Sequence, residues 1–399
     1  MKRVLFVTYG NPEKASRGDD LYSWNIINSI KHCEDVYLHV VSYFEEAKDR
    51  AQNYSLLEKI ADRLTYVPFV YKNILAIGFS KYPAMIANRK TSQMIKTVRD
   101  ILNKEKYDAI IINMFRLSYL IEYIQEYEGT KIFISHNVES QLSKSTYKYQ
   151  HNWIKKLAYY CDYLKTKYYE RRYLTQFDAL TTICDVDKEL FSEILQGKQI
   201  EVLPPVIDID NHHLSTDKIE DKFILCGAFH WEPKFINLQF LLHAQNISLF
   251  KESGYELMIV GRANKRDVEY INKHYPGIYM TGTVDSVIPY YEKARISIVP
   301  ELVGGGFKLK IAEAVQYGKP IVAIKGSVTD RTMIPGKHYI EADTFEELIS
   351  KAIQLMEDRK LQKELVENAR KLFRDRYSIS YAVGIVNQLI NYDTKTGHC

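Results

Sequence analysis

The chain has 399 residues, of which 46% are hydrophobic and 26% charged, a composition that excludes a fibrous, collagen-like or wholly disordered protein. The length predicts two or three domains, each able to bury a core. The net charge of +4 is too small to predict a nucleic acid as a partner.

The cysteines are odd in number, lie far apart and form no C-x-x-C pair, so neither a disulfide framework nor a thiolate zinc site is predicted. They are Cys33, Cys161, Cys184, Cys226 and Cys399. The apolar run at the start of the chain is too short for a signal peptide. No stretch approaches the roughly 18 uninterrupted apolar residues of a membrane-spanning helix. We therefore expect a cytoplasmic protein.

In the first half of the chain, short apolar runs alternate with longer amphipathic segments, which predicts βαβ units around a parallel sheet. The predicted strands are Val4–Thr8, Val36–Ser42, Ala109–Asn113, Lys131–Ser135, Ala179–Ile183 and Glu201–Leu203. The predicted helices are Leu21–Lys31, Thr91–Leu102 and a long basic one at Asn152–Tyr173. Pro204-Pro205 and the polar stretch Asp208–Asp221 then interrupt the chain like a linker.

The same rhythm restarts after this linker. The predicted strands are Phe223–Cys226, Glu256–Val260, Ser297–Pro300 and Ile321–Ala323. The predicted helices are Leu238–Phe250, Lys265–His274, Lys308–Tyr317, Phe345–Asp358, Leu361–Tyr377 and Ile379–Asn391. We therefore predict an α/β protein with two domains, 1–205 and 206–378, and a final segment, 379–399, that crosses back onto the first domain.

The segment Ser297–Ala323 carries the strongest chemical signal. A strand leads into three consecutive glycines, Gly304, Gly305 and Gly306, and a helix follows from about Lys308. Glycines let the backbone approach a ligand closely, and a helix N-terminus offers unpaired N–H groups to an anion.

Two lysines in the first turn of that helix, Lys308 and Lys310, oppose the helix dipole, so their presence favours a bound diphosphate. Glu313 lies further along the same helix, where a carboxylate can bind two vicinal hydroxyls of a ribose. The alternative interpretation is a glycine-rich turn before a solvated helix, with Lys310 simply exposed.

The sequence GGGFKLKIAEAVQYGKPIVA resembles the C-terminal signature of retaining glycosyltransferases of family 4. These enzymes have the GT-B fold, in which two Rossmann-like domains with parallel sheets face each other across a cleft. Further motifs of the resemblance follow in order: SHNVES at 135–140, VLPP at 202–205, GAFHWEPKFIN at 227–237, LMIVGR at 257–262 and GTVDSVIPYYEKARISIVP at 282–300. The resemblance covers nearly the whole chain.

The resemblance implies that the C-terminal domain binds a nucleotide diphosphate sugar and the N-terminal domain an acceptor. Glu313 would bind the ribose hydroxyls and Lys308 the diphosphate. The backbone N–H groups of Gly305, Gly306 and Phe307 would approach the sugar or the phosphates.

The sequence departs from the family pattern at two places. Gly305 stands where the first of two glutamates is common, and Glu301 is near but out of register. Ala228 stands where many members have an arginine, and Lys234 matches the expected phosphate-binding lysine only loosely. Arg262 is therefore a candidate helper at the diphosphate, with an ordinary surface residue as the alternative.

In the N-terminal half, the match of His136 and Glu139 to the family motif implies that His136 lies beside the donor sugar and the acceptor and orients hydroxyl groups. Glu139 would contact the acceptor or the loop backbone. In the loop at 9–20, Gly18 is the candidate backbone contact, and Asp19 or Asp20 would bind an acceptor hydroxyl. We assign catalytic roles to His136 together with Lys308 and Glu313.

The segment 144–172 combines eight lysines and arginines with only two acidic residues and eight aromatic ones. This mixture is typical of peripheral contact with an anionic membrane, here the inner face of the cell membrane. The alternative interpretation, which the pattern favours slightly, is a long helix with solvated lysines and buried tyrosines.

The resemblance implies a glycosyltransferase that moves a sugar, with retention, to a hydroxyl of a glycan or lipid-linked acceptor in cell-surface polysaccharide synthesis. No cofactor is expected, and a metal is not expected to be required, because the lysines can neutralise the diphosphate. One alternative is another GT-B reaction, such as epimerisation or phosphorolysis. Another is a non-catalytic binding or scaffolding subunit. A nicotinamide enzyme is disfavoured, because no G-x-G-x-x-G follows the first strand.

Overall fold

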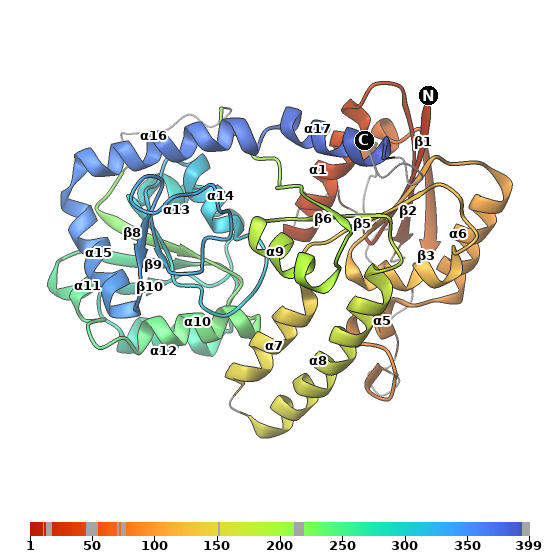
Figure 1. Ribbon diagram of the computed structural model, residues 1–399. Coiled ribbons are helices and arrows are strands. Elements are labelled where there is room, and N and C mark those ends of the chain that lie inside the picture. Colours follow the sequence, from red (N-terminus) through yellow and green to blue (C-terminus); the bar gives the residue numbers. More distant parts are fainter. Residues whose placement is uncertain are drawn as a thin grey trace. The chain divides into compact units, whose positions relative to one another are not determined.

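The computed structural model describes residues 1–10, 12, 18–44, 55–69, 72, 77–150, 152–210 and 219–392. It divides into two units (Figure 1). Unit 1 contains residues 1–206 and helix α17 (Ile379–Ile390), and unit 2 contains residues 207–378. Cys399 and parts of the predicted loop at 9–20 and of the linker at 208–221 lie outside the described residues.

Among the described residues, unit 1 is built on a seven-stranded parallel sheet in the order β3-β2-β1-β4-β5-β6-β7. Its strands are β1 (Lys2–Thr8), β2 (Val36–Phe44), β3 (Arg63–Pro68), β4 (Ala109–Asn113), β5 (Thr130–Ile134), β6 (Ala179–Thr182) and β7 (Gln199–Val202). The central strand β4 has the sequence AIIIN and is buried along its whole length, as expected of a parallel strand with helices on both faces.

The helices of unit 1 cover the faces of this sheet. They are α1 (Gly18–His32), α3 (Ser55–Ile60), α5 (Ala84–Arg89), α6 (Ser92–Lys104), the 3-10 helix η2 (Phe115–Tyr123), α7 (Glu139–Tyr149), α8 (Trp153–Leu174), α9 (Asp185–Ile194) and α17. Local chemistry sets their ends: the Thr91 side chain accepts a hydrogen bond from the N–H of Met94 and caps α6. Helix α17 packs against α1, as predicted for the returning segment (Figure 1).

Unit 2 is built, in its described residues, on a six-stranded parallel sheet in the order β10-β9-β8-β11-β12-β13. Its strands are β8 (Lys222–Cys226), β9 (Glu256–Val260), β10 (Ile278–Met280), β11 (Ile296–Val299), β12 (Ile321–Ile324) and β13 (Ile340–Ala342). Its helices are α10 (Glu232–Leu242), α11 (Leu249–Glu252), α12 (Lys265–His274), α13 (Ile288–Lys293), α14 (Leu309–Gln316), α15 (Phe345–Glu357) and α16 (Arg359–Arg376).

Alternate residues of β8 enter cores on opposite faces of the unit 2 sheet. Phe223 and Leu225 pack with one apolar cluster, and Ile224 and Cys226 with the other. The predicted α/β class with two Rossmann-like domains is therefore confirmed. One predicted helix, Leu238–Phe250, is wrong: α10 begins earlier, at Glu232, and ends at Leu242, and the short α11 follows separately.

Both sheets reverse their strand order at one place, between β1 and β4 in unit 1 and between β8 and β11 in unit 2. In open parallel sheets, ligands bind beyond the carboxyl ends of the strands at such a reversal, because the flanking loops diverge there. The loops that follow these strands carry most of the residues that the sequence singles out. The fold therefore directs attention to two sites, one in each unit.

Candidate functional site

The glycine loop of unit 2 connects β11 to α14. Gly304 and Gly306 have φ angles of +132° and +65°, a region that side chains disfavour, so glycine is required there. Lys308 is the N-cap residue of α14, and the helix begins at Leu309. The loop therefore ends directly at a helix N-terminus, as the sequence predicts.

The Lys308 side chain is buried and turns back onto this loop. Its Nζ donates hydrogen bonds to the carbonyl oxygens of Gly305, at 2.7 Å, and Gly306, at 3.1 Å. In a planar trans peptide the C=O and N–H groups point in opposite directions. Because the two carbonyls face Lys308, the N–H groups of Gly306 and Phe307 point away from it, and neither has a protein acceptor among the described residues.

Glu301, at the start of the same loop, is bound by two lysines. Its Oε2 accepts a hydrogen bond from Lys234 Nζ at 2.5 Å, and its Oε1 lies 2.5 Å from Lys310 Nζ. Only 1% of the Glu301 side chain is exposed. The interpretation of Lys310 as a solvated residue is therefore wrong, because Lys310 is buried against Glu301.

Burial and charge act in opposite directions on this cluster. Burial raises the pKa of Glu301, but Lys310, Lys234 and Lys308 together lower it far below its usual range, so the carboxylate stays ionised. Burial lowers the pKa of Lys234 to about 7, and Lys310 and Lys308 add to the effect, although Glu301 opposes it. The cluster holds more cationic groups than Glu301 can neutralise.

Glu313 lies on α14 beyond these lysines. The Tyr291 hydroxyl, from α13, donates a hydrogen bond to Glu313 Oε2 at 3.0 Å, and the Tyr291 ring stacks on Tyr317. Burial raises the pKa of Glu313, and the hydrogen bond from Tyr291 and the charge of Lys310 partly offset this rise. The described part of the chain gives the other oxygen, Oε1, no hydrogen bond, so Oε1 can accept one from a ligand hydroxyl.

Two buried polar side chains hold the loop after β11 in place. Asn237 of α10 accepts hydrogen bonds from the N–H groups of Leu302 and Val303 and donates to the Val303 carbonyl at 2.6 Å. Ser327 accepts from the Glu301 N–H at 3.1 Å. Sequence reasoning missed these two residues and Tyr291. Asn237 is the last residue of the motif GAFHWEPKFIN at 227–237, and its place in this motif is the one sequence feature that could have indicated its role.

The other predicted donor-site residues lie on neighbouring loops. Ala228 follows β8, and a Cβ on Gly261 would lie 2.1 Å from the carbonyl oxygen of Gly227, so the loops after β8 and β9 touch through glycine backbone. Arg262 follows β9 and its residue is exposed. The structure therefore brings Lys234, Lys308 and Lys310 together around Glu301. Arg262 lies on the neighbouring loop, where its carbonyl accepts a hydrogen bond from the His230 N–H.

In unit 1, His136 follows β5 and is buried at the carboxyl end of the sheet. Its Nε2 lies 2.8 Å from Oδ1 of Asn113, the last residue of β4. The Asn113 amide in turn donates to the hydroxyls of Thr8, at 2.9 Å, and Ser23, at 2.8 Å. Since an amide N–H₂ already directed at two hydroxyls leaves Oδ1 as the acceptor, His136 donates through Nε2.

The other ring nitrogen of His136 faces the start of α1. Nδ1 lies 3.7 Å from Asp19 Oδ1, and Asp19 also pairs with Arg116 at 3.2 Å. Gly18 is the first residue of α1. The structure thus brings together His136, Asp19 and Gly18, and adds Asn113 and Arg116, which sequence reasoning missed.

Glu139 is the first residue of α7 and is buried. Its N–H donates to Glu170 Oε1 of α8 at 2.8 Å, and the Ser140 N–H and hydroxyl donate to Glu170 Oε2. Burial, with the neighbouring Glu170, raises the pKa of Glu139 to about 8, and burial raises that of Glu170 to about 7. Glu170 therefore caps α7 from the neighbouring helix α8, 31 positions along the chain, a role that the sequence does not predict.

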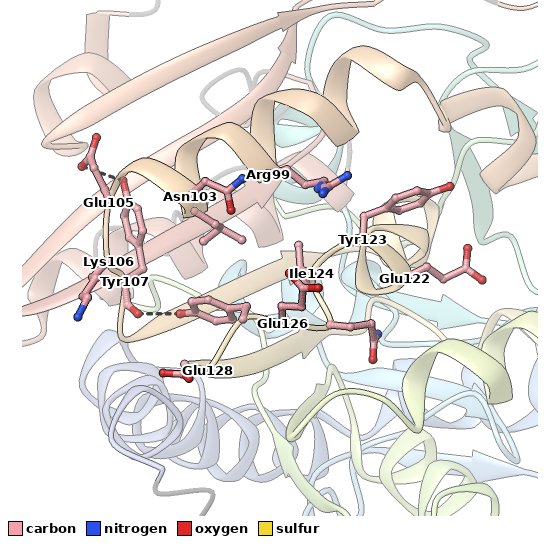
Figure 2. A pocket seen from close by; sticks show the side chains of 14 residues that line it. Arg99, Asn103, Glu105, Lys106, Tyr107, Glu122, Tyr123, Ile124, Glu126 and Glu128 are labelled. Carbon is pink, nitrogen blue, oxygen red and sulfur yellow. Dashed lines mark hydrogen bonds between the residues drawn. The ribbon is translucent and has the colours of Figure 1, made fainter.

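The pocket of about 550 Å³ in unit 1 lies elsewhere (Figure 2). Residues 105–107 and 122–129 line it, directly before β4 and β5, so it lies at the amino end of the sheet, opposite His136. No group of three or more His, Cys, Asp or Glu side chains in the described part of the chain is arranged to hold a metal ion. Within the described ranges, each helix is too short or too polar to pass through a bilayer.

The two sites offer different chemistry. The unit 2 site presents ammonium groups, free N–H groups and a helix N-terminus, which together stabilise an anion with several negative charges. Beside these groups, Glu313 presents a carboxylate oxygen that can bind hydroxyls. The unit 1 site presents an imidazole, a carboxylate and a guanidinium that can orient hydroxyl groups.

A protein-family model matches most of unit 2. Residues 220–358, about a third of the chain, match the family model described as Glycosyl transferases group 1. This match covers the β8 loop, the glycine loop and Glu313. No curated protein matches the sequence.

Solved structures resemble the whole chain. Sucrose-phosphate synthase of Thermosynechococcus elongatus has a TM-score of 0.70 at 14% identity, covering 98% of both chains. A glycosyltransferase of Rickettsia africae has a TM-score of 0.62 at 15% identity, covering 98% of this chain and 99% of its own. HepE of Anabaena, solved with UDP and glucose, has a TM-score of 0.61 at 14% identity, with the same coverage. At these identities the likeness shows the fold, which is that of GT-B glycosyltransferases.

Proposed function

We propose that the protein is a retaining glycosyltransferase of family 4. It transfers a sugar from a nucleotide diphosphate sugar to a hydroxyl of a glycan or lipid-linked acceptor in cell-surface polysaccharide synthesis. Unit 2 binds the donor and unit 1 binds the acceptor. The match of unit 2 to a glycosyltransferase model and the complex of HepE with UDP and glucose support this proposal.

The observation that carries the proposal is the group of lysines around the glycine loop. Lys234 and Lys310 share the single carboxylate of Glu301, and Lys308 binds the loop carbonyls, so positive charge remains for a ligand. A diphosphate placed before the N–H groups of Gly306 and Phe307 would be bound by those N–H groups, which Lys308 orients by holding the loop carbonyls from the other side, and the positive charge nearby would stabilise it through space. Glu313, held by Tyr291, then binds the ribose hydroxyls.

The proposed reaction breaks the bond between the anomeric carbon and the diphosphate oxygen. The acceptor oxygen forms the new bond on the same face of the sugar, and its proton passes to the departing diphosphate. Lys308 and the N-terminus of α14 stabilise the charge that develops on this leaving group. Because these cations stabilise the leaving group, we propose that no divalent metal and no other cofactor is required.

The acceptor hydroxyl is oriented by unit 1 in this proposal. His136, fixed through Nε2 by Asn113, faces Asp19 with Nδ1, and these groups bind sugar hydroxyls. Gly18 offers its backbone at the start of α1, and Glu139 remains a candidate acceptor contact. We propose that the enzyme works in the cytoplasm.

Turnover tests this function directly. Purified full-length protein is incubated with each of a panel of nucleotide diphosphate sugars, with and without glycan and lipid-linked acceptors, and the released nucleotide diphosphate is measured. The proposal predicts release only when an acceptor is present, unchanged by EDTA, and loss of release in Lys308→Ala. Release without an acceptor would indicate hydrolysis, and conversion of the donor into an isomeric nucleotide sugar without net release would indicate an epimerase. Donor binding without any conversion would indicate a non-catalytic subunit.

A further inference from the structure

The outer face of α8 carries an apolar stripe that no part of the described chain covers. Six large apolar or aromatic side chains on this helix are at least 42% exposed: Trp153, Ile154, Leu157, Tyr160, Leu164 and Tyr168. Exposed apolar side chains are unremarkable singly, but a contiguous group of this size marks an interaction site. These six side chains are called the α8 stripe below.

Helical spacing places the α8 stripe on one side of the helix. Trp153, Leu157, Leu164 and Tyr168 recur at intervals of four, seven and four residues, which a repeat of 3.6 residues per turn aligns on one face. The buried residues Thr166, Tyr169 and Tyr173 lie on the opposite face and attach α8 to unit 1. The helix is therefore apolar on two faces, and only one of them belongs to the core.

By the same helical spacing, Lys156, Lys167 and Arg171 flank the α8 stripe, whereas Lys155 lies on the side of Thr166 and Tyr173. Six exposed basic side chains on α7 and α8 form no ion pair in the described part of the chain: Lys144, Lys148, Lys155, Lys156, Lys167 and Arg171. The two acidic residues of α8 point elsewhere. Asp162 accepts a hydrogen bond from the Ala84 N–H, and Glu170 is buried as the cap of α7. Helices α7 and α8 lie side by side as a hairpin (Figure 1). The exposed residues of this hairpin are therefore both apolar and positively charged.

We infer that the α8 stripe docks onto an anionic lipid surface. From Trp153 to Tyr168 the stripe extends along about 22 Å of helix, enough to lie in the plane of a bilayer interface. Tryptophan and tyrosine favour this interface because their rings are apolar at one end and polar at the other. The bordering lysines bind the anionic headgroups while the apolar side chains enter the acyl boundary.

The positive charge beside the α8 stripe favours a lipid surface over a second copy of the chain as the binding partner. A symmetric dimer formed through α8 would bring two identical surfaces together, each with unpaired lysines around its apolar centre. The like charges would oppose that contact, whereas anionic lipids neutralise them. The segment 144–172 is helical with exposed lysines, as the alternative interpretation predicts, but only part of its aromatic residues is buried.

Vesicle binding of the full-length protein tests the inference. We expect co-sedimentation with vesicles of phosphatidylcholine and phosphatidylglycerol, at least tenfold weaker binding to pure phosphatidylcholine, and weakening with salt. Two double variants test the apolar and the electrostatic contributions to vesicle binding separately. Trp153→Ser with Leu157→Ser removes apolar contact, and Lys156→Glu with Lys167→Glu reverses charge. Each is expected to reduce binding to anionic vesicles at least tenfold, and because these side chains are exposed, unfolding is not expected.

A matched control lies on unit 2. Tyr270→Ser with Lys273→Glu on α12 changes an exposed aromatic residue and an exposed lysine that are far from α8 in sequence, and vesicle binding is expected to stay unchanged. Insertion has its own signature: brominated lipids should quench tryptophan fluorescence in the wild type, and Trp153→Phe should lose that quenching. Binding that is unaffected by the serine variant would overturn the inference. So would dimerisation through α8 in place of lipid binding.

The inference stands on α8 alone and does not require the proposed transferase activity. Calorimetric measurement of nucleotide diphosphate binding to the same variants tests the lipid inference and the proposed transferase function separately. Nucleotide binding without vesicle binding would contradict the lipid inference and leave the proposed function intact. Vesicle binding without nucleotide binding would contradict the proposed function and leave the lipid inference intact.

Discussion

Glu301 Oε1 lies 2.5 Å from Lys310 Nζ, and the other oxygen of the same carboxylate binds Lys234, so one buried glutamate holds two lysines beside the glycine loop. Glu301→Gln leaves these buried ammonium groups without a counter-ion. Removing one partner of a buried ion pair costs about 3–5 kcal/mol, so we expect a loss of this size in urea unfolding. The exposed pair of Lys360 and Glu364 provides the control, since Glu364→Gln should change stability by less than about 1 kcal/mol. Equal effects of the two variants would contradict this account of Glu301.

Tyr291 acts on the ligand through Glu313. Tyr291→Phe removes the hydrogen bond that holds Glu313 Oε2 while keeping the ring and its stacking on Tyr317. A hydrogen bond of this kind contributes about 1 kcal/mol, so we expect about fivefold weaker nucleotide binding by calorimetry. Tyr290→Phe, next in the chain, should leave the affinity unchanged. Full affinity in Tyr291→Phe would show that Glu313 needs no support from α13.

The protonation state of Lys234 makes donor binding depend on pH. Because burial lowers its pKa to about 7, Lys234 is mostly neutral at pH 8 and mostly charged at pH 6. A bound diphosphate favours the charged form, so binding of a nucleotide diphosphate sugar should take up a proton at pH 8 and little at pH 6, and the affinity should fall as the pH rises through 7. Calorimetry in buffers of different ionisation enthalpy measures this uptake. Lys234→Arg, which stays charged, should abolish it, and unchanged uptake in that variant would assign the proton to another group.

The alternation of apolar runs and amphipathic segments predicts the interior strands because both of their faces are buried. The strands that sequence reasoning missed, β3, β10 and β13, all lie at sheet edges. An edge strand has a neighbour on one side only, and β3 is partly exposed along its length, so its apolar run is broken by polar residues. These edge strands therefore lack the pattern from which the other strands are predicted, and β7, at the other edge of the unit 1 sheet, is predicted only in part, as Glu201–Leu203.

The sequence predicts only those residues of the candidate site that lie close together in one motif. The glycines, Lys308 and Glu313 belong to one short motif, and the structure places them on one loop and helix. The pairs Glu301 with Lys234 and Glu139 with Glu170 join residues 67 and 31 positions apart. Such pairs depend on the order of strands in the sheet and on the packing of α7 against α8, which local patterns do not contain.

The acceptor site of unit 1 depends on the orientation of His136. His136→Ala should lower kcat about 100-fold, the loss expected when a reacting hydroxyl is misplaced, and should leave donor binding unchanged because the donor site belongs to unit 2. Asn113→Ala should have a smaller effect in the same direction, since it frees the ring without removing it. His32→Ala, at the exposed end of α1, is the control. A changed donor affinity with unchanged kcat would contradict the assignment.

Glu139 makes the stability of unit 1 depend on pH. Its folded pKa of about 8 lies above the ordinary value of 4.5, so its contribution is fully present below about pH 4.5 and is lost as the pH rises through 8. The thermal midpoint should therefore fall between pH 5 and pH 8.5, and Glu139→Gln should reduce that fall by removing the ionisation. Glu126→Gln, on the surface of unit 1, should leave it as in the wild type. A pH dependence equally steep in Glu139→Gln would assign the effect elsewhere.

We propose that the glycine loop, the lysines and Glu313 form a nucleotide diphosphate site. The most direct test of this proposal is calorimetric and thermal-shift binding of a panel of nucleotides and nucleotide sugars to the wild type and to Glu313→Ala, since a ligand that binds the folded state raises its stability. We expect nucleotide diphosphates of one base to raise the thermal midpoint, and we expect this rise to be smaller in Glu313→Ala. Absence of a shift with every nucleotide diphosphate and nucleotide sugar at millimolar concentration would contradict the proposal.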